Sequence, residues 1–165
     1  MPHIKNMVKK DLTFIEMALA IHKIKKTHDD LSQKEIAKML GKTKSFISTA
    51  CRIGVLDQKI IDMLYKYRKY KFANNLKVCN RLVRLEEVRG KIIAFKMAMQ
   101  IKDKEERDGF DESVFLRILT KEIQFAKELE KSRQIEGPIE RVLKIDRMVR
   151  EYIEDKNGDH RSKFK

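Results

Sequence analysis

The sequence predicts an all-α protein in which a multi-helix domain built around a helix-turn-helix is followed by an α-helical hairpin. Composition is the first observation: the helix formers Lys, Glu, Leu, Ile and Met dominate, whereas the 165 residues include only 6 Gly and 2 Pro. Periodicity is the second. Apolar residues recur at spacings of three and four along most of the chain, which is the pattern of amphipathic helices.

The first ten residues include three lysines and no acidic residue and show no periodicity, so we interpret 1–10 as a flexible basic arm. A frayed terminus is the simpler interpretation, and an arm lying along DNA phosphates or in a minor groove is the alternative. Thr13 and Glu16 then stand at the spacing of a capping box, and Leu12 and Met17 flank them as a hydrophobic staple. These residues predict a helix that extends to about residue 26.

A helical hairpin is predicted from Leu31 to Arg52. Ser32 and Glu35 form a second capping box, which starts the first helix. Gly41 supplies the left-handed backbone that ends it, and Thr43 caps the second helix. The side chains expected to face inward are Ile36, Ala37 and Leu40 in the first helix and Phe46, Ile47 and Ala50 in the second.

The outer face of the second helix is expected to carry Lys44, Ser45, Ser48, Thr49 and Arg52. Such a face suits the DNA major groove, because arginine can form two hydrogen bonds with guanine, and serine or threonine can meet bases or phosphates. Any short, capped helical hairpin would show the same core pattern. The DNA-binding interpretation depends on three residues that a helix-turn-helix needs at fixed positions. They are the small Ala37 where the helices approach, Gly41 in the turn and the branched Ile47 opposite Ala37.

The formal charge of +13 is unevenly distributed. Residues 1–56 hold 11 Lys and Arg against 5 Asp and Glu, residues 57–104 hold 13 against 5, and residues 105–165 hold 14 against 15. The net charge is therefore +6 for 1–56 and +8 for 57–104, whereas 105–165 is nearly neutral. The positive excess surrounds the predicted helix-turn-helix. This distribution is typical of a surface that faces phosphates.

Asp57 is expected to cap a helix that begins at Gln58. The segment 65–72, Y-K-Y-R-K-Y-K-F, alternates aromatic and basic residues, which could indicate a strand or a platform for single-stranded bases. Because no second strand is predicted, we interpret it as a helix end and a loop in which Lys69 and Lys71 meet duplex phosphates. Further helices are expected from about residue 74 to Gly90 and over 91–101.

The polar run 102–109 is the strongest predicted boundary, because composition and charge change there. A helix over about 111–134, a stop at 137–138 and a last helix over 139–154 form the predicted hairpin. The expected domains are a DNA-binding domain over 11–104, a hairpin for dimerisation or partner binding over 105–156, and a disordered tail over 157–165.

The sequence favours neither catalysis nor metal binding. Cys51 and Cys79 are far apart, and His22 and His28 have no partner at ligand spacing, so packing or surface roles are expected for all four. The sequence shows neither a phosphate-binding glycine loop nor a recognisable nucleophile and base, so we expect no enzyme and no cofactor. With no apolar run long enough to span a membrane and no signal peptide, a cytoplasmic location is expected.

Three segments carry a resemblance to a known family. They are D-L-T-F-I-E-M-A before the hairpin, L-S-Q-K-E-I-A-K-M-L-G-K-T-K-S-F-I-S within it and V-L-D-Q-K-I-I-D-M-L after it. From Asp11 to about Arg84 the sequence resembles the DNA-binding domain of ParB/KorB partition proteins, and VirB is a similar relative. Asp57 stands where the family usually has proline, and the G-E-R-R-type motif of the family's nucleotide-binding module is absent.

The resemblance implies a sequence-specific protein that binds double-stranded DNA in plasmid or phage partition or in transcription regulation. It implies a nucleoid or plasmid location and, as partners, a second copy of the chain and a ParA-type ATPase or another protein. The DNA-binding residues expected from the resemblance and the charge pattern are Gln33, Lys42, Thr43, Lys44, Ser45, Ser48, Thr49, Arg52, Lys69 and Lys71. The alternative function is an adaptor or inhibitor whose carboxy-terminal helices bind another protein, with weak and non-specific DNA binding.

Overall fold

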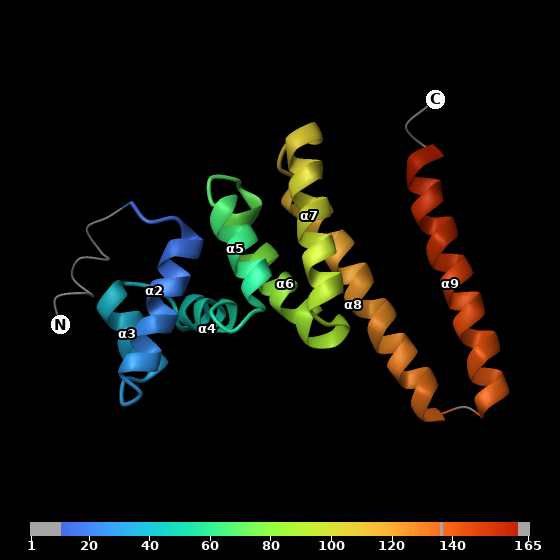
Figure 1. Cartoon of the computed structure of the whole chain (residues 1–165), viewed down its shortest axis with the longest axis horizontal. Helices are drawn as coiled ribbons and strands as arrows, with labels where there is room; N and C mark the ends of the chain where they lie inside the picture. The colour runs from blue at the N-terminus through green and yellow to red at the C-terminus, as the bar shows by residue number, and fades with distance from the viewer. Residues whose placement is uncertain (1–10, 136, 162–165) are drawn as a thin grey trace. The chain divides into compact units, whose positions relative to one another are not determined.

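The computed structural model describes residues 11–135 and 137–161, and every regular element in these ranges is helical. The predicted arm at 1–10 and residues 162–165 lie outside the described residues. The helices are α2 (Phe14–Thr27), α3 (Gln33–Leu40), α4 (Lys44–Ile53), α5 (Gln58–Lys66), the short 3-10 helix η1 (Phe72–Asn74), α6 (Leu76–Arg89), α7 (Lys91–Asp108), α8 (Glu112–Ile135) and α9 (Pro138–Arg161) (Figure 1). The all-α fold class is therefore confirmed.

The predicted capping residues start the first three helices. The Thr13 backbone N–H donates to a Glu16 carboxylate oxygen at 3.0 Å, and the Ser32 N–H donates to Glu35 at 2.8 Å. In return, the Ser32 hydroxyl accepts the Glu35 N–H at 3.2 Å, and the Thr43 hydroxyl accepts the N–H of the third residue of α4 at 3.1 Å. These bonds satisfy backbone donors that a helix start leaves without intrahelical partners.

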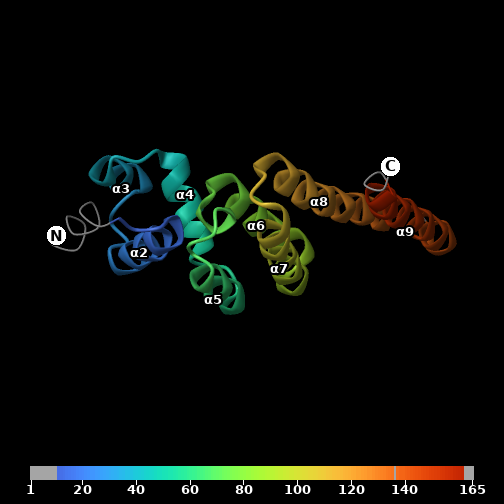
Figure 2. The same cartoon turned by 90° about the horizontal axis from the view of Figure 1, so that it is seen from above.

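The helix-turn-helix consists of α3, a short turn and α4, as Figure 2 shows. Gly41 ends α3 with φ +60°, in the left-handed region that the sequence predicted. In α4, Ile47, Ala50 and Ile53 are fully buried. These side chains fix the helix in place because α4 packs against α2, α3 and α6.

One core extends from α2 into the first half of α8. Phe115, Leu119 and Ile123 are buried in the same apolar cluster as the helix-turn-helix. Helix α7 packs along α6 and continues through the predicted boundary at 102–109 as far as Asp108. The polar residues there form ion pairs one helical turn apart, Lys102 with Glu106 and Lys104 with Asp108, each at 2.8 Å.

The chain divides into two compact units after Ile123. Within the second unit, the end of α8 and α9 form the expected antiparallel hairpin, and the rings of Phe125 and Tyr152 stack with centroids 5.0 Å apart. Helix α9 continues to Arg161, although the sequence predicted its end at residue 154 and a disordered tail from 157. Each residue added to an existing helix gains a backbone hydrogen bond whether or not its side chain is apolar. The polar composition after residue 154 therefore did not indicate the end of the helix. The domain limits 11–104 and 105–156 stay a prediction.

Candidate nucleic-acid interface

The exposed face of α4 carries three of the predicted DNA-binding residues. Lys44 and Ser45 are exposed in its first turn, and Ser48 is half-buried one turn later. Helix α4 itself contains no acidic residue, and 31–56 holds five Lys and Arg against a single carboxylate, Glu35. Five cations against one carboxylate give the segment 31–56 a net positive charge.

The turn before α4 and the start of α3 add three predicted residues to this surface. Lys42 and Thr43 are exposed, and the Lys42 Nζ lies 5.5 Å from the centroid of the Phe46 ring. The Phe46 ring packs edge-on against Phe14 at 5.2 Å, so it links the turn to α2. Gln33 is half-buried at the first position of α3. The structure therefore brings Gln33 together with the residues of the turn and of α4 on one helix-turn-helix.

Thr49 was predicted to face outward, and this prediction is wrong. The residue is only 5% exposed. Helix α4 packs against α6 as well as against α2 and α3, so a wider arc of its surface is covered than the apolar residues alone indicate. Thr49 lies one turn before Ile53 on that arc. It is therefore a core residue and is unavailable to DNA.

Arg52 is not a free side chain on the outer face either. Its guanidinium donates to the Asn80 side-chain oxygen at 2.9 Å and to the Glu87 carboxylate at 2.7 Å, both on α6. The other carboxylate oxygen of Glu87 accepts from Arg84 at 3.1 Å. The hydrogen bond from Arg52 is the main reason that the pKa of Glu87 lies below its usual range. Arg52 therefore lies away from the core but is bonded to α6, and its role in DNA binding stays a prediction.

Lys69 and Lys71 are exposed on a separate element, the loop between α5 and η1. This loop is anchored at one end by Glu105 of α7, whose carboxylate accepts the backbone N–H groups of Lys71 and Phe72 at 2.8 and 2.9 Å. The alternating segment 65–72 forms the end of α5, a turn and the start of η1, and it forms no strand, as its sequence indicated. Lys69 and Lys71 are the only predicted site residues outside the helix-turn-helix.

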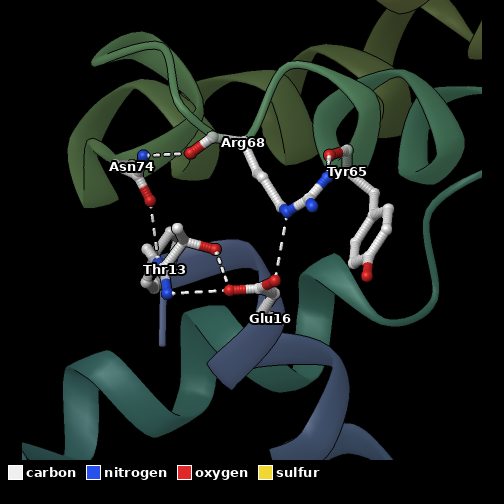
Figure 3. Close-up of polar contacts among 6 residues, drawn as sticks. Thr13, Glu16, Tyr65, Arg68 and Asn74 are labelled. Carbon is white, nitrogen blue, oxygen red and sulfur yellow. Dashed lines mark hydrogen bonds and ion pairs between the residues drawn. The ribbon is translucent and has the colours of Figure 1, made fainter. Parts of the chain in front are cut away.

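A polar network fixes the same loop to α2 (Figure 3). Arg68 forms an ion pair with Glu16 at 3.1 Å and lies over the Tyr65 ring at 4.6 Å. The Asn74 side chain accepts the backbone N–H of Phe14 at 2.8 Å and donates to the backbone oxygen of Arg68. The pKa of Glu16 is lowered, chiefly by the hydrogen bond from the Thr13 hydroxyl. The network therefore holds the basic loop in a defined position against the helix behind the hairpin.

Sequence reasoning missed the α6 side chains that meet the end of α4. Asn80 and Glu87 are polar residues 28 and 35 positions after Arg52, so no local pattern links them to it. The signal present in the sequence was a pair of arginines three residues apart, Arg81 and Arg84, on one side of this helix. It indicated a basic surface but not the contact with Arg52.

The described part of the chain presents neither a metal-binding cluster nor a membrane-spanning helix. No group of three or more His, Cys, Asp and Glu side chains is arranged to hold a metal ion there. In the same residues, no helix combines the length and apolar character that crossing a membrane requires.

Comparison with known proteins gives one match. The family model described as the ParB HTH domain matches residues 10–107, a range that includes α2 to α6 and all of α7 except its last residue. Comparisons with curated proteins and with solved structures give no match. The family is one of DNA-binding domains. Its match covers the helix-turn-helix, α6 and the basic loop between α5 and η1. The chain thus belongs to the ParB HTH domain family.

Proposed function

We propose that this protein binds double-stranded DNA sequence-specifically and inserts the exposed face of α4 into the major groove. The observation that carries the proposal is the helix itself: Lys44, Ser45 and Ser48 share an accessible face with no acidic residue in the helix. Lysine and serine can bond to base edges, and the surrounding cations release counterions from the DNA backbone. Of the ten expected residues, nine remain in the proposed interface, and Thr49 is removed.

The residues of the interface are expected to have two different roles. Lys44, Ser45 and Ser48 would contact bases, because they lie on the accessible face of the helix. Lys42, Lys69, Lys71 and the polar residues Gln33 and Thr43 would contact the phosphate backbone from its edges. Phosphate contacts set affinity for every duplex, whereas base contacts distinguish one sequence from another.

Selection of bound sequences from a random duplex pool tests the proposal. The full chain is expected to enrich one motif. Lys44→Ala is then expected to weaken binding to that motif by about 1–3 kcal/mol, or 5- to 150-fold, and to relax one base position. Lys42→Ala is the matched control, because it removes the same charge from the turn and is expected to weaken all duplexes about equally. Recovery of no motif, or equal losses for both variants on matched and scrambled DNA, would contradict the proposal.

We further propose that the protein acts as a homodimer. Helix α9 exposes Val142, Val149 and Ile153, which are seven and four residues apart and so fall along one side of the helix. A second copy of α9 would cover these side chains. The two helix-turn-helix units of the dimer would then read two half-sites of the DNA. Val149→Glu should shift the sedimentation-equilibrium mass from dimer to monomer. A wild-type monomer at tens of micromolar would contradict the dimer.

We propose a role in plasmid or phage partition or in transcription regulation, with a nucleoid or plasmid location and, for partition, a ParA-type ATPase as partner. Stimulation of ATP hydrolysis by such an ATPase in the presence of the selected duplex supports partition. The exposed apolar residues of α9 also suit the alternative of an adaptor that binds another protein. Lack of motif enrichment combined with salt-sensitive DNA binding would favour that alternative.

A further inference from the structure

An open hollow of about 460 Å³ lies beside the end of α4. It is bounded by the last turn of α4, by the exposed face of α6 and by one residue of α8. The lining residues are Arg52, Lys77, Asn80, Arg81, Arg84 and Leu116. Four of these six side chains are cationic, and none is acidic.

The acidic residues near the hollow neutralise only part of this charge. Glu87 pairs with Arg52 and Arg84, and Glu112 pairs with Lys77 at 2.6 Å. No described residue forms an ion pair with Arg81, which is exposed. Four cations against two carboxylates leave an excess of two positive charges, so the hollow favours an anion.

Glu87, which is bonded to two of the lining arginines, shows how these side chains bind an oxyanion. Its carboxylate lies between two guanidinium groups and accepts one hydrogen bond from Arg52 and one from Arg84. Phosphate oxygens accept from arginine with the same geometry and carry more charge. The side chains of Arg52 and Arg84 are 36% and 50% exposed, so an incoming anion can reach them.

We propose that a backbone phosphate of the bound duplex occupies this hollow, binds Arg81 and displaces Glu87 from Arg52 and Arg84. The proposal rests on the proposed function, because it places the phosphate next to the bases that α4 contacts. Arg52 then serves as a phosphate ligand at the end of the recognition helix, and Asn80 holds it in position. Glu87 competes with every duplex for the two arginines and so limits non-specific binding.

The salt dependence of DNA binding tests the proposal. Loss of one phosphate contact lowers the slope of log affinity against log salt by about 0.9, so Arg81→Gln is expected to lose about 3.5-fold less affinity than wild type between 50 and 200 mM salt. The control is Arg107→Gln, which removes the same charge from an exposed position near the end of α7 and should leave the slope unchanged. Arg81→Lys should keep most of the slope, because lysine retains the charge.

Glu87→Gln provides the second measurement. Removal of the competing carboxylate is expected to raise the affinity for scrambled duplex more than Asp62→Asn, a matched loss of one negative charge on α5. Thermal unfolding of each variant verifies that it is folded. An Arg81→Gln slope equal to that of Arg107→Gln, or a Glu87→Gln affinity equal to that of Asp62→Asn, would overturn the phosphate site.

The outcomes separate this proposal from the proposed function and from a site for small anions. A wild-type protein that binds no duplex refutes the proposed function itself, whereas normal binding with unchanged slopes refutes only the hollow. Inorganic phosphate is titrated at constant ionic strength, and the Arg81 side-chain N–H resonance is followed by NMR. Saturation at low millimolar phosphate would assign the hollow to a free phosphate and overturn the duplex assignment. A shift with duplex alone is the expected result.

Discussion

Replacing Gly54 by alanine tests how closely the end of the recognition helix approaches α2. Gly54 has φ −64°, a conformation that alanine adopts without strain. A Cβ at this position would lie 2.1 Å from Cγ, 2.4 Å from Cβ and 2.6 Å from Nδ1 of His22 in α2. Ordinary contacts begin near 3.4 Å, so these atoms would have to separate by about 0.8 to 1.3 Å. Rotation of the His22 side chain cannot achieve this, because its Cβ moves only with the backbone.

The sign of the change in unfolding free energy shows whether the alanine fits at position 54 or overpacks the contact. Where alanine fits, it stabilises a protein by about 0.4–1 kcal/mol, because it restricts the unfolded chain. Where it overpacks a contact, it destabilises by about 1–3 kcal/mol. The geometry predicts the second result for Gly54→Ala, with a lower urea midpoint and an unchanged m-value.

A double-mutant cycle isolates the contact. His22→Ala should leave the penalty of Gly54→Ala largely intact, since the Cβ at 2.4 Å remains. His22→Gly should reduce the penalty, when each double variant is compared with its own single histidine variant. A stabilised Gly54→Ala protein, or equal penalties in all three backgrounds, would refute the close approach of α4 and α2.

Three further predictions concern the fold that presents α4. Ile47→Ala should lower the free energy of unfolding by about 2–5 kcal/mol, because the Ile47 side chain is fully buried. The control Val55→Ala, at a position that is 70% exposed, should change this free energy little. Equal urea midpoints for the two variants would contradict the prediction. The pKa of Glu16 is lowered in the folded state, so its stabilising contribution is present above the ordinary value of 4.5 and is lost as the pH falls through the folded pKa. Unfolding measured from pH 6 to 3 should therefore show a smaller acid loss in Glu16→Gln than in wild type, and identical curves would contradict the assignment. Burial raises the pKa of Cys79 to about 12, so iodoacetamide at pH 8 should alkylate it only in urea, and labelling of the folded protein, followed by mass spectrometry, would contradict its burial.

The helix starts could be predicted because their signals are local. Ser32 and Glu35 are three residues apart, and each satisfies a backbone donor of the other. Gly41 likewise adopts the left-handed conformation that its position after an apolar stripe indicates. Such features depend on neighbouring residues alone, so the sequence contains all of the information that they need.

The features of the candidate site that the sequence did not show depend on packing between distant segments. Thr49 is polar, and only the contact of α4 with α6 shows that it is covered. Arg52 meets Asn80 and Glu87 across 28 and 35 residues, so its hydrogen bonds follow from the tertiary fold. Helix α7 also continues through the polar segment 102–108, where ion pairs one turn apart support a helix that the composition alone did not indicate.

The central claim is that the exposed face of α4 lies against base pairs. Its most direct test is an NMR titration of the ¹⁵N-labelled full chain with the duplex recovered from selection, in which amide shifts are compared between matched and scrambled DNA. The account predicts that Lys44, Ser45 and Ser48 shift differently with the two duplexes, whereas Lys69 and Lys71 shift alike with both. Unchanged α4 resonances in the presence of saturating matched duplex would contradict it.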